Sequence, residues 1–236
     1  MPALCRGVAV FGNWLLLAWA MATTILSGPR RAPASGLRPK GLVVALHGYG
    51  SNGDDLISLA PYWDKLLPDV QFSSPHAPTH VPGFGAMFQW FPIESMDPVH
   101  LAKGARDAAP VLEAFLEAEM ANFGVTKAQT ALVGFSQGTM MALHVGLASK
   151  DPYAGILGYS GALVGNPVMA SKPPVLLVHG DQDDVVPLVA SQMAQQFLKN
   201  AGLDARLHVS PQAAHTIAMD GLQLGGAFLA RVLKGA

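Results

Sequence analysis

The sequence Gly-Phe-Ser-Gln-Gly at residues 134–138 constrains the fold more than any other stretch of the chain. It lies between an apolar run at residues 130–133 and a helix-like run at residues 139–147. A G-x-S-x-G turn between a strand and a helix holds its serine at the apex of a strained turn, and the glycines keep side chains away from the crowded backbone. Free amides at the helix N-terminus would stabilise a negative charge that forms beside Ser136. The pattern predicts a nucleophilic Ser136, and the alternative is a glycine-rich loop with an ordinary serine.

The composition favours one folded domain and excludes several classes of function. The 236 residues are 50% hydrophobic and 13% charged, which is enough apolar material for one well-buried core. The formal net charge is -1 and no basic run exceeds Arg30-Arg31, so we expect no nucleic-acid partner. Cys5 is the only cysteine, which excludes an internal disulfide and a thiolate metal site. We expect no metal and no other cofactor.

Residues 1–20 differ from the rest of the chain and are assigned to an apolar leader. They contain one cation, Arg6, and an apolar run that is too short for a comfortable bilayer span, so no stable membrane span is expected. The run ends in Ala-Trp-Ala and resembles a signal peptide, which leaves export to the periplasm as an alternative. Because its start is only weakly positive, we predict instead a cytoplasmic protein that begins at Met21, with one domain over residues 21–236. The sequence does not fix the oligomeric state and leaves a homodimer open.

Apolar runs alternate with amphipathic runs, a pattern typical of an α/β fold with a mostly parallel central sheet and helices on its faces. The expected strands are residues 41–46, 70–75, 130–133, 153–159, 174–178 and 205–209. The expected helices are residues 54–67, 100–121, 139–147, 187–200 and 222–233. No insertion between these elements is long enough to form a large cap domain.

The run over residues 100–121 has the periodicity of a long amphipathic helix. The side chains expected on its buried face are Leu101, Ala105, Ala108, Leu112, Phe115 and Met120. The acidic side chains Glu113, Glu117 and Glu119 are expected to face solvent.

Two loops that follow strands are candidates for parts of a site. Residues 47–53 contain three glycines and can bring backbone amides close to a ligand, but they lack the Gly-Lys-Ser/Thr ending of a phosphate loop. We interpret this loop as half of an oxyanion hole, with His47 as a hydrogen-bonded structural residue. Residues 76–98 lack helical or strand periodicity and are rich in aromatic residues. We interpret them as a pocket wall with Trp90 and Phe91 as substrate-binding residues, and the alternative is that their rings only fill the edge of the core.

Acyl transfer by a serine requires a base and a carboxylate that orients the base. Because the carboxyl ends of parallel strands gather at one edge of a sheet, loops after the later strands can reach Ser136. His215 lies in such a loop, whereas His179 and His208 lie beside or within strands and suit packing. Among the acids of the other loop we choose Asp183 and interpret Asp181 as a turn residue and Asp184 as a charge at a helix N-terminus. The order serine, aspartate, histidine is that of α/β-hydrolases.

Four motifs in order resemble the phospholipase/carboxylesterase family, which contains bacterial carboxylesterases and acyl-protein thioesterases. They are L-H-G-Y-G at residues 46–50, G-F-S-Q-G at 134–138, H-G-D-Q-D at 179–183 and A-H at 214–215. The resemblance extends roughly from Met21 to the C-terminus.

The resemblance implies that Ser136, Asp183 and His215 form a catalytic triad and that the backbone amides of Tyr49 and Gln137 form the oxyanion hole. It implies a metal-free serine esterase of the α/β-hydrolase fold that acts on small ester or thioester substrates, with short to medium acyl chains expected because no large cap is present. Lipase, thioesterase and peptidase activities are alternatives within enzymes. A non-catalytic protein that binds a small ligand on the same fold is the alternative of another class.

Overall fold

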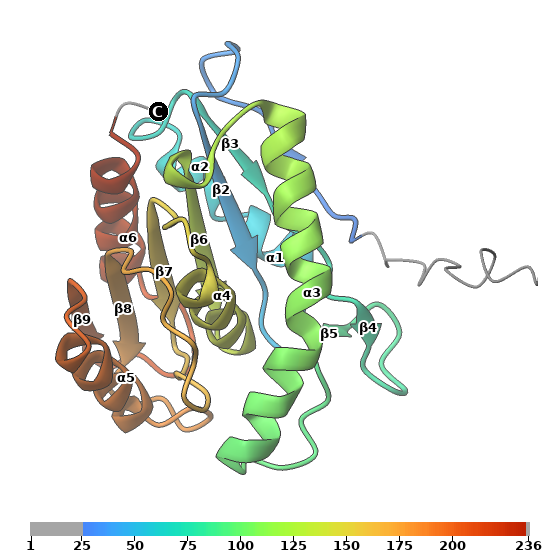
Figure 1. Cartoon of the computed structure of the whole chain (residues 1–236), viewed down its shortest axis with the longest axis vertical. Helices are drawn as coiled ribbons and strands as arrows, with labels where there is room; N and C mark the ends of the chain where they lie inside the picture. Colours follow the sequence, from blue (N-terminus) through green and yellow to red (C-terminus); the bar gives the residue numbers. More distant parts are fainter. Residues whose placement is uncertain (1–25, 235–236) are drawn as a thin grey trace, which may run out of the picture.

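The computed structural model describes residues 26–234, and within them a seven-stranded sheet of order β1-β3-β2-β6-β7-β8-β9 forms the centre of the fold (Figure 1). The strands of this sheet are β1 (Arg30–Arg31), β2 (Gly41–Leu46), β3 (Val70–Ser73), β6 (Thr130–Phe135), β7 (Gly155–Tyr159), β8 (Val175–Gly180) and β9 (Ala205–Ser210). Only β1 is antiparallel to its neighbour among these described strands. The mostly parallel sheet that the sequence predicts is thereby confirmed.

Helices cover both faces of the sheet, which explains why β2, β3, β7 and β8 are buried along their whole length and β6 at every residue except Phe135. The helices are α1 (Gly53–Ile57), α2 (Ala60–Trp63), α3 (Pro98–Phe123), α4 (Gln137–Ala148), α5 (Leu188–Asn200) and α6 (Met219–Val232), with a short 3₁₀ helix, η1, at Lys127–Gln129. One apolar cluster joins α3, α4 and α5 to one face of the sheet. A second cluster joins α1, α2 and α6 to the other face.

The carboxyl ends of β2, β6, β8 and β9 lie at one edge of the sheet because these strands are parallel and in close register. Leu46 at the end of β2 pairs with Gly134 near the end of β6, and Gly180 at the end of β8 pairs with Ser210 at the end of β9. The loops that follow these four strands therefore emerge at the same edge, which is the place where open α/β sheets bind their ligands.

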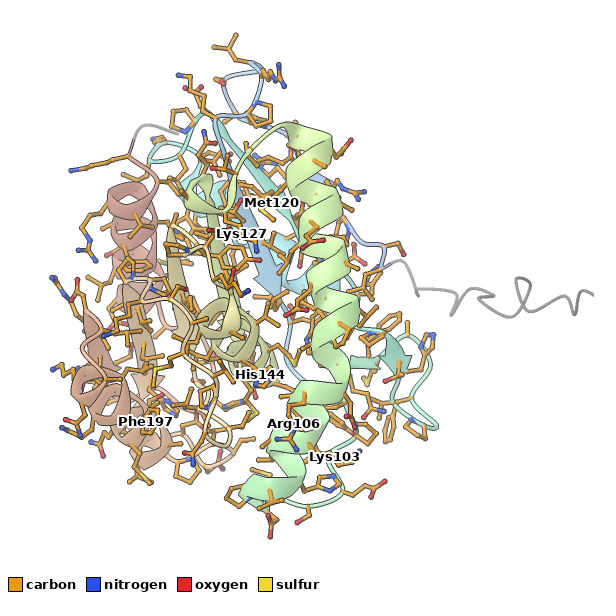
Figure 2. The ribbon with its side chains drawn as sticks, viewed as in Figure 1. Lys103, Arg106, Met120, Lys127, His144 and Phe197 are labelled. Atoms are coloured by element: carbon orange, nitrogen blue, oxygen red, sulfur yellow. The ribbon has the colours of Figure 1, made fainter. Side chains whose placement is uncertain are left out.

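The long helix α3 packs on the sheet through the face that the sequence predicts. The six predicted residues are all buried, and Met120 in Figure 2 belongs to the cluster between α3 and the sheet. The prediction that Glu119 faces solvent is wrong, because its side chain is only 4% exposed. Its carboxylate accepts hydrogen bonds from Arg30 at 2.7 and 2.9 Å and from Ser73 Oγ at 2.6 Å, which ties α3 to β1 and β3.

The single helix expected over residues 54–67 is also wrong, because the chain forms α1 and α2 instead. Pro61 lies in the first turn of α2 and has no amide hydrogen to continue a helix from α1. The chain ends α1 at Ser58, whose amide bonds back to the Asp55 and Leu56 carbonyls. Leu56 and Trp63 are nevertheless buried against the same face of the sheet.

Residues 76–98 are not wholly irregular. They contain a small antiparallel pair of strands, β4 (Thr79–His80) and β5 (Phe88–Gln89), separate from the main sheet. An isolated bridge between Ser51 and Phe88 joins this pair to the loop after β2. Residues 76–98 thus contact the loop that the sequence assigns to the oxyanion hole.

The leader predicted for residues 1–20 and the start predicted at Met21 lie outside the described residues. Among the helices of residues 26–234, none combines the length and the apolar character needed to cross a bilayer.

Candidate active site

Ser136 stands at a strained turn between β6 and α4. Its backbone has φ 53° and ψ -114°, a conformation that non-glycine residues rarely adopt. The amide of Ser136 donates to the Tyr159 carbonyl at 2.9 Å, and the Ser136 carbonyl accepts from the Thr139 amide at 3.0 Å. A Cβ atom at Gly138 would overlap the Leu46 carbonyl oxygen, so this turn requires glycine. The strained strand-turn-helix geometry predicted around Ser136 is therefore present, and the role of Ser136 as nucleophile stays a prediction.

Asp183 and His215 are hydrogen-bonded to each other, although 32 residues separate them in the chain. His215 Nδ1 lies 2.8 Å from Asp183 Oδ2. Because an ionised carboxylate only accepts, Nδ1 carries the proton and Nε2 is left free to accept one. The carboxylate of Asp183 is fully buried and the His215 side chain is 17% exposed. Asp181 and Asp184 are both exposed, so the structure singles out Asp183 among the three acids.

Backbone amides hold the other oxygen of Asp183. The Val185 and Val186 amides donate to Oδ1 at 3.0 and 2.9 Å. Burial by itself would raise the pKa of Asp183, but the hydrogen bonds from His215 and from these amides outweigh it and hold the pKa below its usual value. Asp183 therefore remains a carboxylate at neutral pH.

Ser136 and His215 are not hydrogen-bonded to each other among the described contacts. Hydrogen bonds of a catalytic serine are often long in the absence of substrate and tighten when substrate binds. His215 lies against Phe135, the residue before the serine, with ring centroids 4.9 Å apart. The imidazole is thus beside the elbow, with its Nε2 not committed to another residue of the described chain.

The two amides assigned to the oxyanion hole come from different loops at this edge. The Gln137 amide is the first amide of α4. Tyr49 comes directly after Gly48, which packs closely on Phe135 and Ser136. Within residues 26–234, neither amide donates a hydrogen bond to a described partner. Both are therefore available to an oxyanion, as the prediction requires.

His47 is a structural residue of the loop assigned to the oxyanion hole (residues 47–53, here called the oxyanion loop), as interpreted from the sequence. It is completely buried, its Nδ1 lies 2.7 Å from the Gly48 carbonyl, and its Nε2 accepts from the Ala77 amide at 2.9 Å. The indole Nε1 of Trp90 donates to the His47 carbonyl at 2.9 Å. Burial lowers the pKa of His47 to about 4, although the bond to Gly48 opposes this shift, so the ring is neutral near pH 7.

Trp90 and Phe91 are buried beside the oxyanion loop rather than beside His215. Their side chains are 2% and 3% exposed, and they border a cleft of about 390 Å³ against α3. The residues that line this cleft include neither Ser136 nor His215. Direct contact of Trp90 and Phe91 with substrate therefore stays an untested prediction, and their burial favours the alternative of core packing.

The sequence reasoning missed the role of the Gln137 side chain. Its Oε1 accepts from the Trp90 amide at 2.9 Å and its Nε2 donates to the Phe91 carbonyl at 2.7 Å. These bonds fasten the segment that contains Trp90 to the turn that contains Ser136. A glutamine directly after the serine, where its side chain must lie near the sheet edge, was the signal that could have indicated this.

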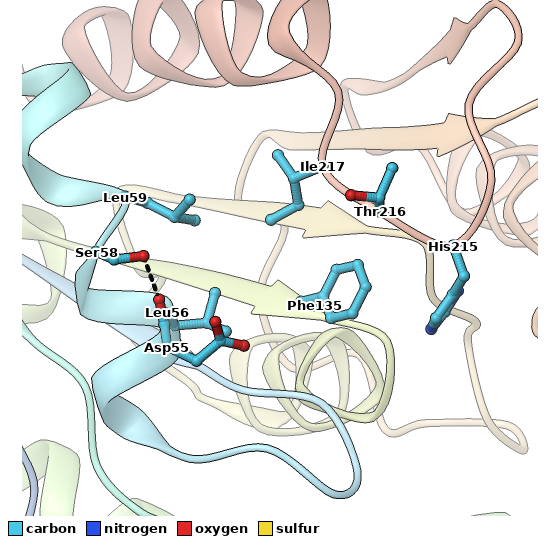
Figure 3. A pocket seen from close by; sticks show the side chains of 8 residues that line it. All are labelled: Asp55, Leu56, Ser58, Leu59, Phe135, His215, Thr216 and Ile217. Carbon is cyan, nitrogen blue, oxygen red and sulfur yellow. Dashed lines mark hydrogen bonds between the residues drawn. The ribbon is translucent and has the colours of Figure 1, made fainter.

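A cleft of about 350 Å³ opens next to His215 (Figure 3). Its apolar lining consists of Leu56, Leu59, Phe135 and Ile217, and its polar lining consists of Asp55, Ser58, His215 and Thr216. In Figure 3 the His215 ring stands at one end of the cleft and Leu59 at the other. Over residues 26–234, no cluster of three His, Cys, Asp or Glu side chains is placed to hold a metal ion.

The motifs and the geometry agree with a comparison to known families. The profile of the phospholipase/carboxylesterase family matches residues 32–233. The chain belongs to the phospholipase/carboxylesterase family. As a member of this family it is a carboxylesterase-type serine hydrolase with the α/β-hydrolase fold.

Proteins similar to this chain include esterases and thioesterases. The solved structure of esterase PE8 is 47% identical, covers 89% of this chain and all of its own, and superposes with a TM-score of 0.84. Acyl-protein thioesterase 1 of Gibberella zeae is 28% identical over 218 residues, which span 81% of this chain and 90% of that protein. Esterase YpfH of Escherichia coli K12 is 27% identical over 177 residues, which span 75% of this chain and 76% of that protein.

Proposed function

We propose that this hydrolase cleaves carboxylic esters through an acyl-enzyme on Ser136, with His215 as general base and acid and Asp183 as the residue that orients His215. The observation that carries the proposal is the partly buried hydrogen bond of 2.8 Å between Asp183 Oδ2 and His215 Nδ1 at the sheet edge that bears the Ser136 turn. This bond fixes the tautomer that a general base requires.

The first half of the reaction forms the acyl-enzyme. Ser136 Oγ attacks the carbonyl carbon of the ester while His215 Nε2 accepts the Oγ proton. The amides of Tyr49 and Gln137 donate to the oxyanion of the tetrahedral intermediate. When the bond to the alcohol breaks, His215 returns the proton to the departing oxygen and the acyl group stays on Ser136.

The second half releases the acid. A water molecule loses a proton to His215 Nε2 as its oxygen attacks the acyl carbon, and the same two amides hold the second oxyanion. The bond to Ser136 Oγ then breaks and His215 returns the proton to the serine. The products are an alcohol and a carboxylic acid, and no other reactant is required.

The cleft beside His215 supports a substrate of short to medium acyl chain. Its volume of about 350 Å³ is near the lower end of the range of small-molecule sites. Its apolar floor of Leu56, Leu59 and Ile217 suits a hydrocarbon chain that extends from the ester carbonyl. We assign the acyl group to this cleft.

A series of 4-nitrophenyl esters of increasing acyl length tests the assignment. Ile217→Trp fills the cleft and should reduce kcat/KM for six- to eight-carbon acyl groups by roughly tenfold or more, while the acetate ester changes little. Val168→Trp, at a side chain that is 72% exposed, is the matched control and should leave the profile unchanged. A parallel loss for all chain lengths in Ile217→Trp would contradict the assignment.

Thioesters are a second candidate class, favoured by the 28% identity to an acyl-protein thioesterase over most of the chain. The same residues serve both reactions, because only the departing atom changes from oxygen to sulfur. Oxygen and sulfur esters that share one acyl group separate the two candidates by their ratio of kcat/KM. A clear preference for the oxygen ester supports a carboxylesterase, and a clear preference for the thioester supports the second candidate.

We also propose that the protein is cytoplasmic, because the start of residues 1–20 carries less positive charge than a signal peptide usually has. Mass spectrometry of the protein from its native host is the test. A cytoplasmic chain that starts at or just after Met21 agrees with the proposal, and a periplasmic chain that starts just after Ala20 contradicts it.

A further inference from the structure

His179 is a second buried histidine at the carboxylate that contacts His215. It occupies the penultimate position of β8, and its side chain is 0% exposed. His179 Nε2 lies 3.2 Å from Asp183 Oδ2, the oxygen that also accepts from His215 Nδ1. The carboxylate of Asp183 thus lies between two imidazoles, only one of which takes part in the proposed reaction.

The contacts of His179 fix the proton on one of its ring nitrogens. Nε2 lies 2.7 Å from the Val186 carbonyl oxygen, which carries no hydrogen, so Nε2 is the donor of that bond. Nε2 also lies 3.2 Å from Asp183 Oδ2, as a close electrostatic contact rather than a hydrogen bond. His179 therefore bonds to the loop of residues 181–187 that carries Asp183, here called the acid loop, and its N–H group lies beside the carboxylate.

The other nitrogen of His179 is held by Ser191 of α5. Nδ1 lies 2.7 Å from Ser191 Oγ, and Ser191 Oγ lies 3.0 Å from the Gly161 carbonyl. The hydroxyl has one proton, which either bonds to Gly161 and leaves Nδ1 protonated or bonds to Nδ1 of a neutral ring. In both arrangements Nε2 keeps its hydrogen, so the orientation of the donor does not depend on the charge of His179.

This chain of contacts extends to the turn that carries Ser136. Gly161 packs so closely on Thr139 and on the Ser136 carbonyl that a Cβ atom there would overlap Thr139. Ser191, His179 and Asp183 are buried, and they connect α5, β8 and the acid loop. Such a fully bonded buried set of polar groups restricts each member to one position.

We propose that His179 is a positioning residue that acts through Asp183 to hold His215 in the orientation required for proton transfer. The inference rests on the proposed triad and adds a residue to it. The imidazole of His179, 3.2 Å from Oδ2, restricts rotation of the carboxylate about its Cβ–Cγ bond, and so keeps Oδ2 directed at His215 Nδ1. The partial positive charge of its Nε2–H group also stabilises the negative charge of Asp183.

The charged groups around this chain of contacts are few. Among the described contacts, Asp183 is the charged group that touches His179. His215 contacts the same carboxylate. Asp55 faces His215 across the cleft from α1. From α5, Ser191 contacts His179, and Gly161 from the turn after β7 contacts Ser191; both residues are uncharged.

A matched pair of substitutions in the full-length enzyme distinguishes the effect of losing the N–H donor from the effect of losing the ring. His179→Met retains a side chain of similar length without a donor, and His179→Gln retains an N–H group near the place of Nε2. His179→Met should lower kcat by roughly 10- to 100-fold with little change in KM, because a small misplacement of the base is costly and substrate is not contacted. His179→Gln should restore kcat to within about threefold of the wild-type enzyme, because an N–H donor again faces Oδ2.

The pH profile of kcat/KM provides a readout that a purely structural role would not change. Loss of the donor concentrates negative charge on Oδ2, which favours protonated His215. The acid limb of the profile should therefore move to higher pH in His179→Met and return in His179→Gln. An unchanged acid limb and an unchanged kcat in a folded His179→Met enzyme would overturn the inference, even if its Tm falls.

Ser191→Ala decides the question if His179→Met does not fold. This change removes the partner of His179 Nδ1 together with the hydrogen bond to the Gly161 carbonyl, and it lies outside the triad. The proton NMR signal of His215 Nδ1–H and the acid limb should both shift in Ser191→Ala relative to the wild-type enzyme. If neither shifts, His179 does not act through Asp183 and the inference fails.

Two controls separate a failure of this inference from a failure of the proposed triad. His208 pairs with Asp220 at 2.8 Å on the surface, so His208→Gln should change neither kcat nor the acid limb. Ser136→Ala tests the triad independently of His179. If Ser136→Ala retains activity, the proposed function fails. If Ser136→Ala is inactive while His179→Met and Ser191→Ala keep the wild-type kcat and acid limb, only the role of His179 fails.

Discussion

The side-chain carbonyl of Gln137 accepts a hydrogen bond of 2.9 Å from the backbone amide of Trp90. The same side chain donates to the Phe91 carbonyl at 2.7 Å, so one glutamine satisfies two backbone groups of a segment far away in the chain. The backbone amide of this glutamine is also one of the two donors proposed for the oxyanion. The turn that carries Ser136 and the segment that supports the oxyanion loop are therefore fastened by a single residue.

Gln137→Met should destabilise the protein and impair catalysis together. The substitution leaves the buried Trp90 amide and Phe91 carbonyl without partners, which should lower the free energy of unfolding by about 2–4 kcal/mol. Because the oxyanion loop leans on this segment, kcat should fall while KM changes less. Urea unfolding and steady-state kinetics measure the two effects.

Gln196→Met, at an exposed position of α5, is the control and should change neither quantity by a measurable amount. Wild-type stability in Gln137→Met would mean that the two hydrogen bonds do not hold the segment.

His47 should make the protein less stable as the pH falls below neutrality. Its pKa is lowered to about 4 in the folded state, mainly by burial, against an ordinary value of 6.5 in the unfolded chain. Between these values the unfolded chain binds a proton that the folded protein does not, so stability decreases as pH decreases through this window. His47 should account for a loss of about 2 kcal/mol between pH 7 and pH 5.

His47→Gln removes this titration, and its glutamine oxygen can still accept from the Ala77 amide. The free energy of unfolding at pH 7 and pH 5 is compared for the wild-type protein, His47→Gln and the exposed control His80→Gln. The pH-dependent loss should be smaller in His47→Gln alone, and an equal loss in all three proteins would argue against a buried neutral His47.

The acid of the site should be Asp183 and neither of its two acidic neighbours. Asp183→Asn should lower kcat by about 10⁴-fold, because an amide in this place favours the wrong tautomer of the histidine. Asp181→Asn and Asp184→Asn alter exposed side chains and should retain near-normal kcat. The reverse pattern, an active Asp183→Asn with an inactive neighbour, would transfer the role to that neighbour.

The depressed pKa of Asp183 adds a stability prediction with a definite sign. Hydrogen bonds hold its folded-state pKa below the ordinary value despite burial, so its contribution to stability is present above pH 4. That contribution is lost as the pH falls through the folded-state pKa. The difference in stability between wild type and Asp183→Asn should therefore shrink in acid, which urea unfolding at pH 3 and pH 6 can measure.

The strands and the sheet edge could be predicted from the sequence because strands covered on both faces are continuous apolar runs. The run at residues 41–46 became β2 with the same ends, and the loops after β6, β8 and β9 carry Ser136, Asp183 and His215 at one edge. Parallel pairing makes this convergence a consequence of the pattern. The contact of Asp183 with His215 followed from it, whereas the catalytic roles stay predictions.

The features that the sequence did not reveal depend on partners far away along the chain. Glu119 has the spacing of a solvent-facing acid, and its burial depends on Arg30, which is 89 residues away. The bonds of Gln137 join it to residues that lie 46 and 47 positions away in the chain, so its position after the serine indicates a role but no local pattern identifies its partners. The break after α1 was readable in Pro61, because a proline cannot continue a helix in its interior.

The acyl-enzyme on Ser136 is tested most directly by trapping it with a fluorophosphonate and locating the adduct by peptide mass spectrometry. The wild-type enzyme should gain one adduct, located on Ser136, with loss of esterase activity in proportion to labelling. Ser136→Ala should gain no adduct and retain less than about a thousandth of the wild-type kcat. An adduct on another residue, or an active Ser136→Ala enzyme that is still inhibited by the reagent, would contradict the assignment of Ser136 as the nucleophile.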